Sequence, residues 1–332
     1  MVSSAILSAW GLYKLSANRD LIAFTRESGV IRWRVPLAPS GSFMERLLFS
    51  ENAVIAAWDY VAAYRKEDGR ELWRVTPRRS AGNCSASVTT DAVVICSRDW
   101  DVSMLDLATG AIRWQVNLAP WVRGLPTLHS VVASGDTVYA STLEAFGNGD
   151  FRRVGHVIAL DRATGRFLWQ FVDGDYTDFR GFNGRPTVAG RLLLYKDAAM
   201  DWLTAIDRFE PRVAWRVHTA PGWAGAPHDV TVADGVAYIG AGDRHAYAVD
   251  VATGRVLWKS PYLQGSQMWA TPCGRFVLSW TGVTTRILDR RSGAYLGDLE
   301  SATESFTDQP YVEGADLFVG RAAEVRRYRC GP

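Results

Sequence analysis

Residues 161–170 read DRATGRFLWQ, and residues 250–259 read DVATGRVLWK. In both stretches a tryptophan follows a glycine by four positions. The same spacing recurs at three further places: Gly29 and Trp33, Gly69 and Trp73, Gly110 and Trp114. Two looser copies complete the series, with Pro211 before Trp215 and with Gly293 before Gly297. Successive copies lie 40, 41, 55, 46, 43 and 39 residues apart, which indicates a repeated structural unit.

The period and composition of this unit indicate a propeller blade of four strands. Each copy consists of short alternating runs rich in Val, Ile, Tyr, Phe and Trp, interrupted by Gly and Asp, and such runs predict strands rather than helices. The A-T-G and E-S-G triplets predict tight turns, in which glycine adopts a positive φ without strain. Six of the 14 tryptophans follow these turns, and we expect them to pack between neighbouring blades.

Eight segments read as the third strand of a blade: LIAFT, VAAYR, SMLDL, HVIALD, WLTAID, AYAVD, TRILD and EVRRYR. We therefore predict an all-β fold, a single propeller over residues 1–332 with eight four-stranded antiparallel blades. Seven blades stay an alternative, because the first blade is one strand short. The N-terminal segment AILSAW is expected to complete the last blade and close the ring, which leaves no open sheet edge.

The strings HVIALDRATGRFLWQF and HAYAVDVATGRVLWKS resemble the repeat of the pyrroloquinoline-quinone-type propellers. This quinoprotein-dehydrogenase-like family also includes an outer-membrane assembly factor, which is periplasmic and lipid-anchored. The resemblance implies the fold and leaves the function open, since one scaffold hosts unrelated activities. For the dehydrogenases of this family, the resemblance implies two features of the site. One is an adjacent Cys-Cys pair that lies over the quinone, and the other is a set of Glu, Asn and Asp residues that bind calcium. This chain has no adjacent cysteines, so we predict no quinone and no other cofactor, and leave a metal open.

Composition narrows the class of partner. The formal charge of +2 and the absence of long basic runs argue against nucleic-acid binding. No run of 18 apolar residues predicts a membrane-spanning helix. The N-terminus lacks the pattern of a signal peptide, so we expect a cytoplasmic protein, with a signal removed beforehand as the alternative. Four reduced, buried cysteines are the expected state, although a disulfide between Cys84 and Cys96 is conceivable.

The D-to-A segments, which lead from the fourth strand of one blade to the first strand of the next, carry the residues that do not repeat. Aligned on the strand that follows, they bring five polar residues to one level near the mouth of an axial funnel: Glu45, Cys84, His129, His228 and Asp308. His129 and His228 are candidate acid/base groups or metal ligands, oriented by Glu45 or Asp308. The candidate ligand-binding residues are Cys84 together with Arg123, Arg180, Arg185, Trp223 and Trp269.

Two insertions are expected on the same face, a long connection in blade 4 at residues 141–155 and the loop leading into blade 5 at residues 173–185. Long ordered loops in compact folds are more often functional than short connectors are. Our first hypothesis is a soluble scaffold that binds a small ligand, a peptide or a partner protein on the D-to-A face. The alternative is an enzyme that performs acid/base chemistry in the funnel, such as a cyclase or hydrolase. Polar groups that merely line a water-filled channel would explain the same residues.

Overall fold

The computed structural model describes most of the 332 residues. The described ranges are 5–8, 11–15, 20–25, 27–37, 47–57, 60–77, 84–97, 100–122, 128–145, 153–173, 179–180, 185–196, 202–219, 230–263, 269–280, 284–299, 311–320 and 325–331. The chain forms two compact units, residues 6–185 and residues 186–332 together with residues 1–5. Each unit is described separately, and the single domain over residues 1–332 stays a prediction.

The unit of residues 6–185 contains four sheets whose strands follow each other in chain order. The strands of sheet 1 are β1 (Ala5–Ser8), β2 (Gly11–Leu15), β3 (Asp20–Phe24) and β4 (Ile31–Pro36), and those of sheet 2 are β5 (Leu47–Phe49), β6 (Ala53–Ala57), β7 (Val61–Arg65) and β8 (Glu71–Val75). Sheet 3 has β9 (Ser87–Val88), β10 (Ala92–Cys96), β11 (Asp101–Asp106) and β12 (Ile112–Asn117), followed by the 3-10 helix η1 (Ala119–Trp121). Sheet 4 has β13 (Leu128–Ser134), β14 (Thr137–Ala145), β15 (Arg153–Asp161), β16 (Phe167–Asp173) and the short β17 (Phe179–Arg180).

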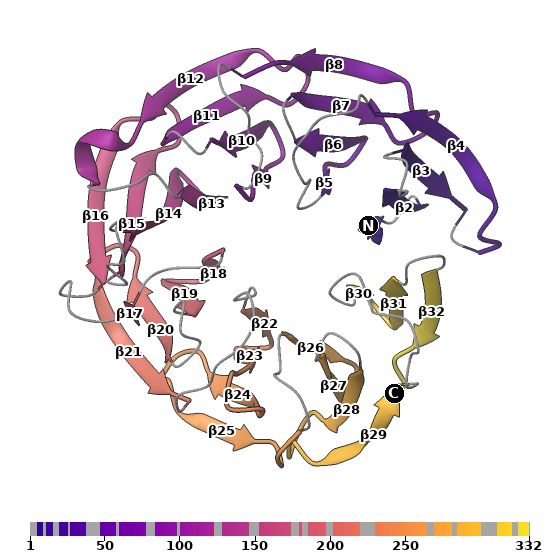
Figure 1. Cartoon of the computed structure of the whole chain (residues 1–332), viewed down its shortest axis with the longest axis vertical. Helices are drawn as coiled ribbons and strands as arrows, with labels where there is room; N and C mark the ends of the chain where they lie inside the picture. The colour runs from indigo at the N-terminus through magenta and orange to yellow at the C-terminus, as the bar shows by residue number, and fades with distance from the viewer. Residues whose placement is uncertain are drawn as a thin grey trace. The chain divides into compact units, whose positions relative to one another are not determined.

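The second unit repeats the pattern (Figure 1). The strands of sheet 5 are β18 (Thr187–Ala189), β19 (Leu192–Lys196), β20 (Trp202–Asp207) and β21 (Arg212–His218), and those of sheet 6 are β22 (Thr231–Ala233), β23 (Val236–Gly240), β24 (Ala246–Asp250) and β25 (Val256–Lys259). Sheet 7 has β26 (Trp269–Cys273), β27 (Phe276–Trp280), β28 (Thr285–Asp289) and β29 (Tyr295–Leu299). Sheet 8 has three strands in the described residues, namely β30 (Tyr311–Glu313), β31 (Asp316–Gly320) and β32 (Val325–Arg329).

These eight sheets confirm the predicted eight blades, and all eight predicted third strands occupy the third position of their sheet. The expected role of the N-terminal strand needs a correction. Strand β1 lies beside β2 in sheet 1, where it supplies the strand that blade 1 seemed to lack. Residues Ala5–Ser8 therefore do not complete sheet 8.

The repeated turn is held by its aspartate. In the turn after β15, the Asp161 carboxylate accepts hydrogen bonds from the backbone nitrogen of Thr164 (2.9 Å) and from its hydroxyl (2.6 Å). Gly165 then adopts φ +72° and donates its N–H to the Asp161 carbonyl. Asp106, Asp250 and Asp289 make the same contacts in their own turns. The D-x-x-[TS]-G pattern is thus a local folding signal, in which glycine takes the left-handed position.

A tryptophan links each sheet to the next at five junctions within the described residues. The indole Nε1 of Trp73 in β8 donates to the Leu107 carbonyl in the turn of sheet 3, at 2.8 Å. The indole ring covers Gly110 of the same turn, where a Cβ atom would lie 2.6 Å from the ring. The same pair of contacts joins four more tryptophans to the turn of the following sheet, namely Trp33, Trp114, Trp215 and Trp258. Glycine is required here for space as well as for backbone conformation.

Apolar side chains fill the space between successive sheets. Between sheets 2 and 3, Ile55 and Ala63 pack with Val93 and Leu105, and all four are fully buried. The middle strand β6 is accordingly apolar throughout, whereas the outer β8 exposes Leu72.

Acid should unfold this protein partly through the turn aspartates. Hydrogen bonds from Thr164 and Thr253 lower the pKa values of Asp161 and Asp250 below the usual 3.8. Their folded-state pKa values are depressed, so their stabilisation is complete above about pH 4 and is lost as the pH falls through the folded pKa. The variant Asp161→Asn/Asp250→Asn should be less stable at pH 7 and should lose less stability between pH 4 and pH 2, as measured by urea unfolding. Parallel pH curves for the variant and the wild type would contradict this.

Candidate functional site

The first strands of sheets 3 and 4 touch at their D-to-A ends. Ser85 and Ser130 form a parallel bridge, and the Val131 N–H donates to the Ser85 carbonyl at 2.9 Å. Cys84 and His129, which precede the bridged residues, therefore stand at the same level on neighbouring strands. This register agrees with the alignment of Cys84 and His129 predicted from the sequence. Behind them, the hydroxyls of Ser130 and Ser141 are buried and hydrogen-bonded at 2.6 Å.

Cys84 is bonded to Cys96 at the end of β10, with 5.7 Å between their Cα atoms. Cys273 of β26 is bonded to Cys330, which follows β32. The expectation of four reduced thiols is thus wrong, and the conceivable Cys84–Cys96 bond is present. Because its sulfur is consumed in a buried disulfide, Cys84 offers no thiol or thiolate to a ligand.

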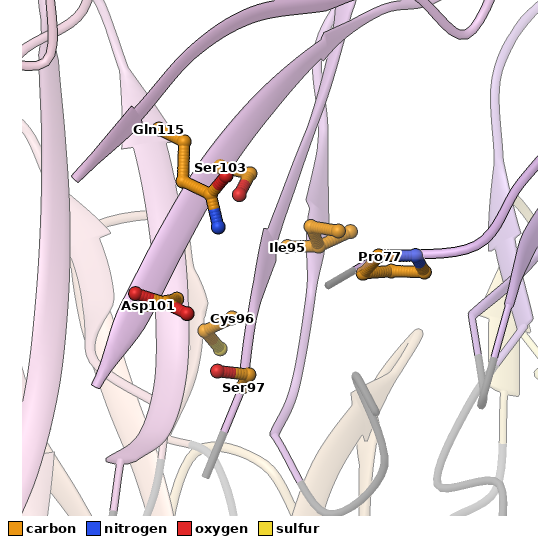
Figure 2. Close-up of a pocket in the computed structure, with 7 residues that line it drawn as sticks. All are labelled: Pro77, Ile95, Cys96, Ser97, Asp101, Ser103 and Gln115. Carbon is orange, nitrogen blue, oxygen red and sulfur yellow. The ribbon is translucent and has the colours of Figure 1, made fainter. Parts of the chain in front are cut away.

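A small polar cavity lies beside this disulfide (Figure 2). Ser97 lines it from the connection between β10 and β11, and Asp101 lines it from the start of β11. Ser103 and Gln115 line it from the sheet itself, and Pro77 from the segment after β8. Its volume is about 10 Å³, which is room for one water molecule and too little for a substrate. We interpret it as a hydration site between sheets 2 and 3.

The two insertions meet at one end of sheet 4. Residues 141–145 and 153–155 continue β14 and β15, so both strands reach nine residues and much of the expected long loop is a hairpin. From the second insertion, β17 pairs in parallel with the start of β15, with Phe179 opposite Arg153 and Arg180 opposite Val154. The sequence predicted that both insertions lie on one face, and this pairing joins them directly. The backbone thus places Arg153 and Arg180 one register position apart on adjacent strands.

A line of buried polar groups crosses the same part of sheet 4, and the sequence analysis did not select it. His156 of β15 is 3% exposed, and its Nδ1 lies 2.6 Å from Nε2 of Gln170. Gln170 Nε2 also donates to the Trp121 carbonyl at 2.8 Å. Because an amide nitrogen only donates, Nδ1 accepts and the ring proton lies on Nε2. His156 is opposite Thr142 of β14, but without the sheet register nothing distinguished it from a core residue.

Trp269, a candidate ligand-binding residue, lies at the start of β26. It is the register partner of Trp280, and the two rings stack with 4.2 Å between centroids. Both side chains are buried, and they pack with Cys273, Leu278 and Leu317. Trp269 therefore contributes to the core at the D-to-A end of sheet 7, and the described structure gives no open ring face to a ligand.

Sheet 6 holds a second polar cluster, in the connection between β23 and β24. Asp243 Oδ2 accepts from the Tyr247 hydroxyl and lies 3.0 Å from Lys259 Nζ. Burial, together with the hydrogen bond to Asp243, raises the pKa of Tyr247 to about 12. The Tyr247 hydroxyl also lies 3.0 Å from the Thr219 carbonyl oxygen. Every charge in this cluster is paired, so we interpret it as a structural cluster that fixes the conformation of the connection between β23 and β24. The string GDRH, at residues 242–245, was the sequence signal that could have identified it.

The remaining candidates are only partly located. His129 lies in β13 and Arg180 in β17 by their backbones, and the half-buried Arg185 lies two residues before β18. Five candidates lie outside the described residues: Glu45, Arg123, Trp223, His228 and Asp308. The acid/base set of His129, His228, Glu45 and Asp308 therefore stays a prediction.

A quinone with its calcium ion would need a cluster of ligating side chains and, by the family resemblance, a pair of adjacent cysteines. Within the described ranges no three His, Cys, Asp or Glu side chains gather as metal ligands would. The observed disulfides join cysteines 12 and 57 positions apart, whereas the quinone enzymes of the family are expected to use adjacent cysteines. We therefore derive no chemistry from a quinone in this chain.

Comparisons with known proteins agree with this architecture. The family profile described as outer membrane protein assembly factor BamB matches residues 8–152 and 153–318. The crystal structure of BamB from Moraxella catarrhalis superposes with a TM-score of 0.72 at 17% identity, covering 98% of this chain and 92% of that one. The computationally designed Ika8 protein gives a TM-score of 0.78 at 15% identity, with coverage of 98% and 95%. These likenesses establish a β-propeller fold.

The curated relatives are quinone enzymes of much greater length. The quinohemoprotein alcohol dehydrogenase ADH IIB of Pseudomonas putida is 28% identical over 153 residues, which cover 42% of this chain. The match spans only 20% of that enzyme. In the described part of this chain, no helix has the length and apolar character needed to cross a membrane.

The two disulfides should differ in what they contribute to stability. Closing loops of 12 and 57 residues restricts the unfolded chain by about 3 and about 4 kcal/mol, respectively. We expect Cys273→Ser/Cys330→Ser to lose more free energy of unfolding than Cys84→Ser/Cys96→Ser in urea titrations. Reduction with dithiothreitol should remove both contributions from the wild type. Four thiols that react with a maleimide in the air-oxidised, unreduced protein would contradict the account.

Proposed function

This chain belongs to the family of outer membrane protein assembly factor BamB, and from this premise we propose that it is a binding scaffold for a partner protein. The partner contacts the D-to-A ends of the sheets, and sheet 4 provides the main contact. Such a scaffold requires no quinone. A peptide or small ligand held by Arg123, Arg180 or Trp223 in the axial funnel belongs to the same proposal.

One observation carries this proposal, the joining of two insertions on sheet 4. In the other sheets the described strands have two to seven residues. On sheet 4, β14 and β15 reach nine residues and β17 adds a further strand from a separate segment. An ordered extension that departs from the repeat supports a recognition role.

The disulfides bear on the compartment. Buried disulfides form and persist in oxidising compartments and are rare in the cytosol. We therefore propose that this scaffold works outside the cytoplasm, in place of the cytoplasmic location expected from the N-terminal sequence. The disulfides Cys84–Cys96 and Cys273–Cys330 support this proposal.

Site-specific photo-crosslinking in the native host tests the binding face. A benzophenone amino acid replaces Glu144 of β14 or Phe179 of β17, and the matched controls replace Asp136 or Ala163 in turns at the opposite end of sheet 4. We expect positions 144 and 179 to give the same protein adduct, identified by mass spectrometry, and positions 136 and 163 to give none. Adducts from the two control positions alone, or different proteins at 144 and 179, would contradict the proposal.

A further inference from the structure

A groove of about 550 Å³ lies between the outer strand of sheet 6 and the turns of sheet 7. Its floor is apolar, with Tyr238 and Trp258 from sheet 6, and Leu257 of β25 lies at its edge. Leu257 is 41% exposed, similar to Leu72 (46%) and Leu168 (38%), which also precede the tryptophan of their repeats. The groove is remote in sequence from the sheet 4 extension and belongs entirely to the unit of residues 186–332.

Three arginines border this floor, and one of them is fully engaged. Arg290 donates to the Tyr238 hydroxyl at 2.9 Å and to Asp234 Oδ2 at 2.6 Å. The carboxylate of Asp289 is also engaged, because its Oδ1 accepts from the backbone and hydroxyl of Ser292. These hydrogen bonds lower the pKa of Asp289, which keeps the turn carboxylate charged and in place. Neither residue has to rearrange when a ligand enters the groove.

The other two arginines retain their charge for a ligand. Arg275 and Arg291 are exposed, and within the described residues neither guanidinium has a carboxylate at ion-pair distance. Arg275 stacks over the Phe276 ring with 4.9 Å to the centroid, which holds its planar head beside the groove. An arginine pair of this kind matches carboxylates in charge and in geometry.

The equivalent junctions of the repeat do not share this charge. In sheets 2 to 8 the residue after the third strand donates its N–H to the carbonyl of a residue in the first turn, and this contact identifies equivalent positions. Arg275 of sheet 7 corresponds to Asp91 in sheet 3 and to Asp136 in sheet 4. It also corresponds to Arg191 in sheet 5, but Arg191 is paired with Asp207 and Glu210. The unpaired arginines therefore distinguish the groove of sheets 6 and 7 from its structural counterparts.

We propose that this groove binds an acidic polypeptide segment of a partner protein, in which a bulky apolar side chain is flanked by carboxylates. The apolar side chain covers Leu257 and the Trp258 floor, and the flanking carboxylates pair with Arg275 and Arg291. The charge complementarity between two unpaired guanidinium groups and an acidic segment selects this occupant over a neutral or basic one.

Fluorescence anisotropy with defined peptides tests the inference. The probe is a fluorescein-labelled peptide with two leucines flanked by four glutamates, and its counterpart carries lysine in place of glutamate. We expect saturable binding of the acidic probe that weakens with added salt, and at least tenfold weaker binding of the basic one. Equal binding of both peptides, or no saturable binding of the acidic probe, would overturn the proposal.

Variants localise the binding. Arg275→Glu/Arg291→Glu should weaken binding of the acidic probe at least tenfold, and Arg275→Gln/Arg291→Gln replaces it if the charge reversal fails to fold. The matched control is Arg166→Glu/Arg255→Glu, which changes the net charge equally at two exposed arginines that directly follow turn glycines outside the groove. The control should bind within twofold of the wild type. Equal loss in both variants would indicate a general charge effect and would contradict the site.

Discussion

The contact on which the fold depends is a tryptophan seated on a glycine of the next sheet. The indole ring needs the missing Cβ of that glycine, and its Nε1 needs the carbonyl at the start of the same turn, as Trp73 shows with Gly110 and Leu107. The turn in its own sheet is shaped by aspartate and by the positive φ of the glycine. Within the described residues, sheets 2, 3 and 6 both present and receive this contact, and such nearest-neighbour interactions propagate the fold along the chain.

The junction between sheets 7 and 8, where the tryptophan is missing, supports this interpretation. Sheet 7 has Gly297 where the tryptophan would stand, so its outer strand cannot make this contact with sheet 8. At this junction the disulfide Cys273–Cys330 joins β26 to the segment after β32. A covalent bond thus links the two sheets where the aromatic contact is missing. The Asp243 cluster and the groove beside Trp258 differ between blades as well, which is where specific binding can develop on a repeated scaffold.

Local sequence signals made the fold predictable. Features that depend on long-range pairing between strands or cysteines could not be predicted. The glycine-to-tryptophan spacing and the eight third strands could be found in the sequence because each depends on residues within one repeat. The sequence also aligned Cys84 with His129, and the register of the Ser85–Ser130 bridge agrees with that alignment. It could not place β1 in sheet 1, show that β17 pairs with β15, or fix the state of the cysteines. Those features depend on partners that spacing does not encode, and buried His156 gave no sequence signal at all.

Substitution of two glycines by alanine tests the central claim most directly. Gly29 and Gly110 have similar φ values, +67° and +73°, but open space surrounds Gly29 whereas the Trp73 ring covers Gly110. Gly110→Ala should lower the free energy of unfolding by at least about 1 kcal/mol more than Gly29→Ala, because only the first forces a clash. This excess should disappear in a Trp73→Ala background. Equal costs for the two alanines, or an excess that persists without the indole, would contradict the account.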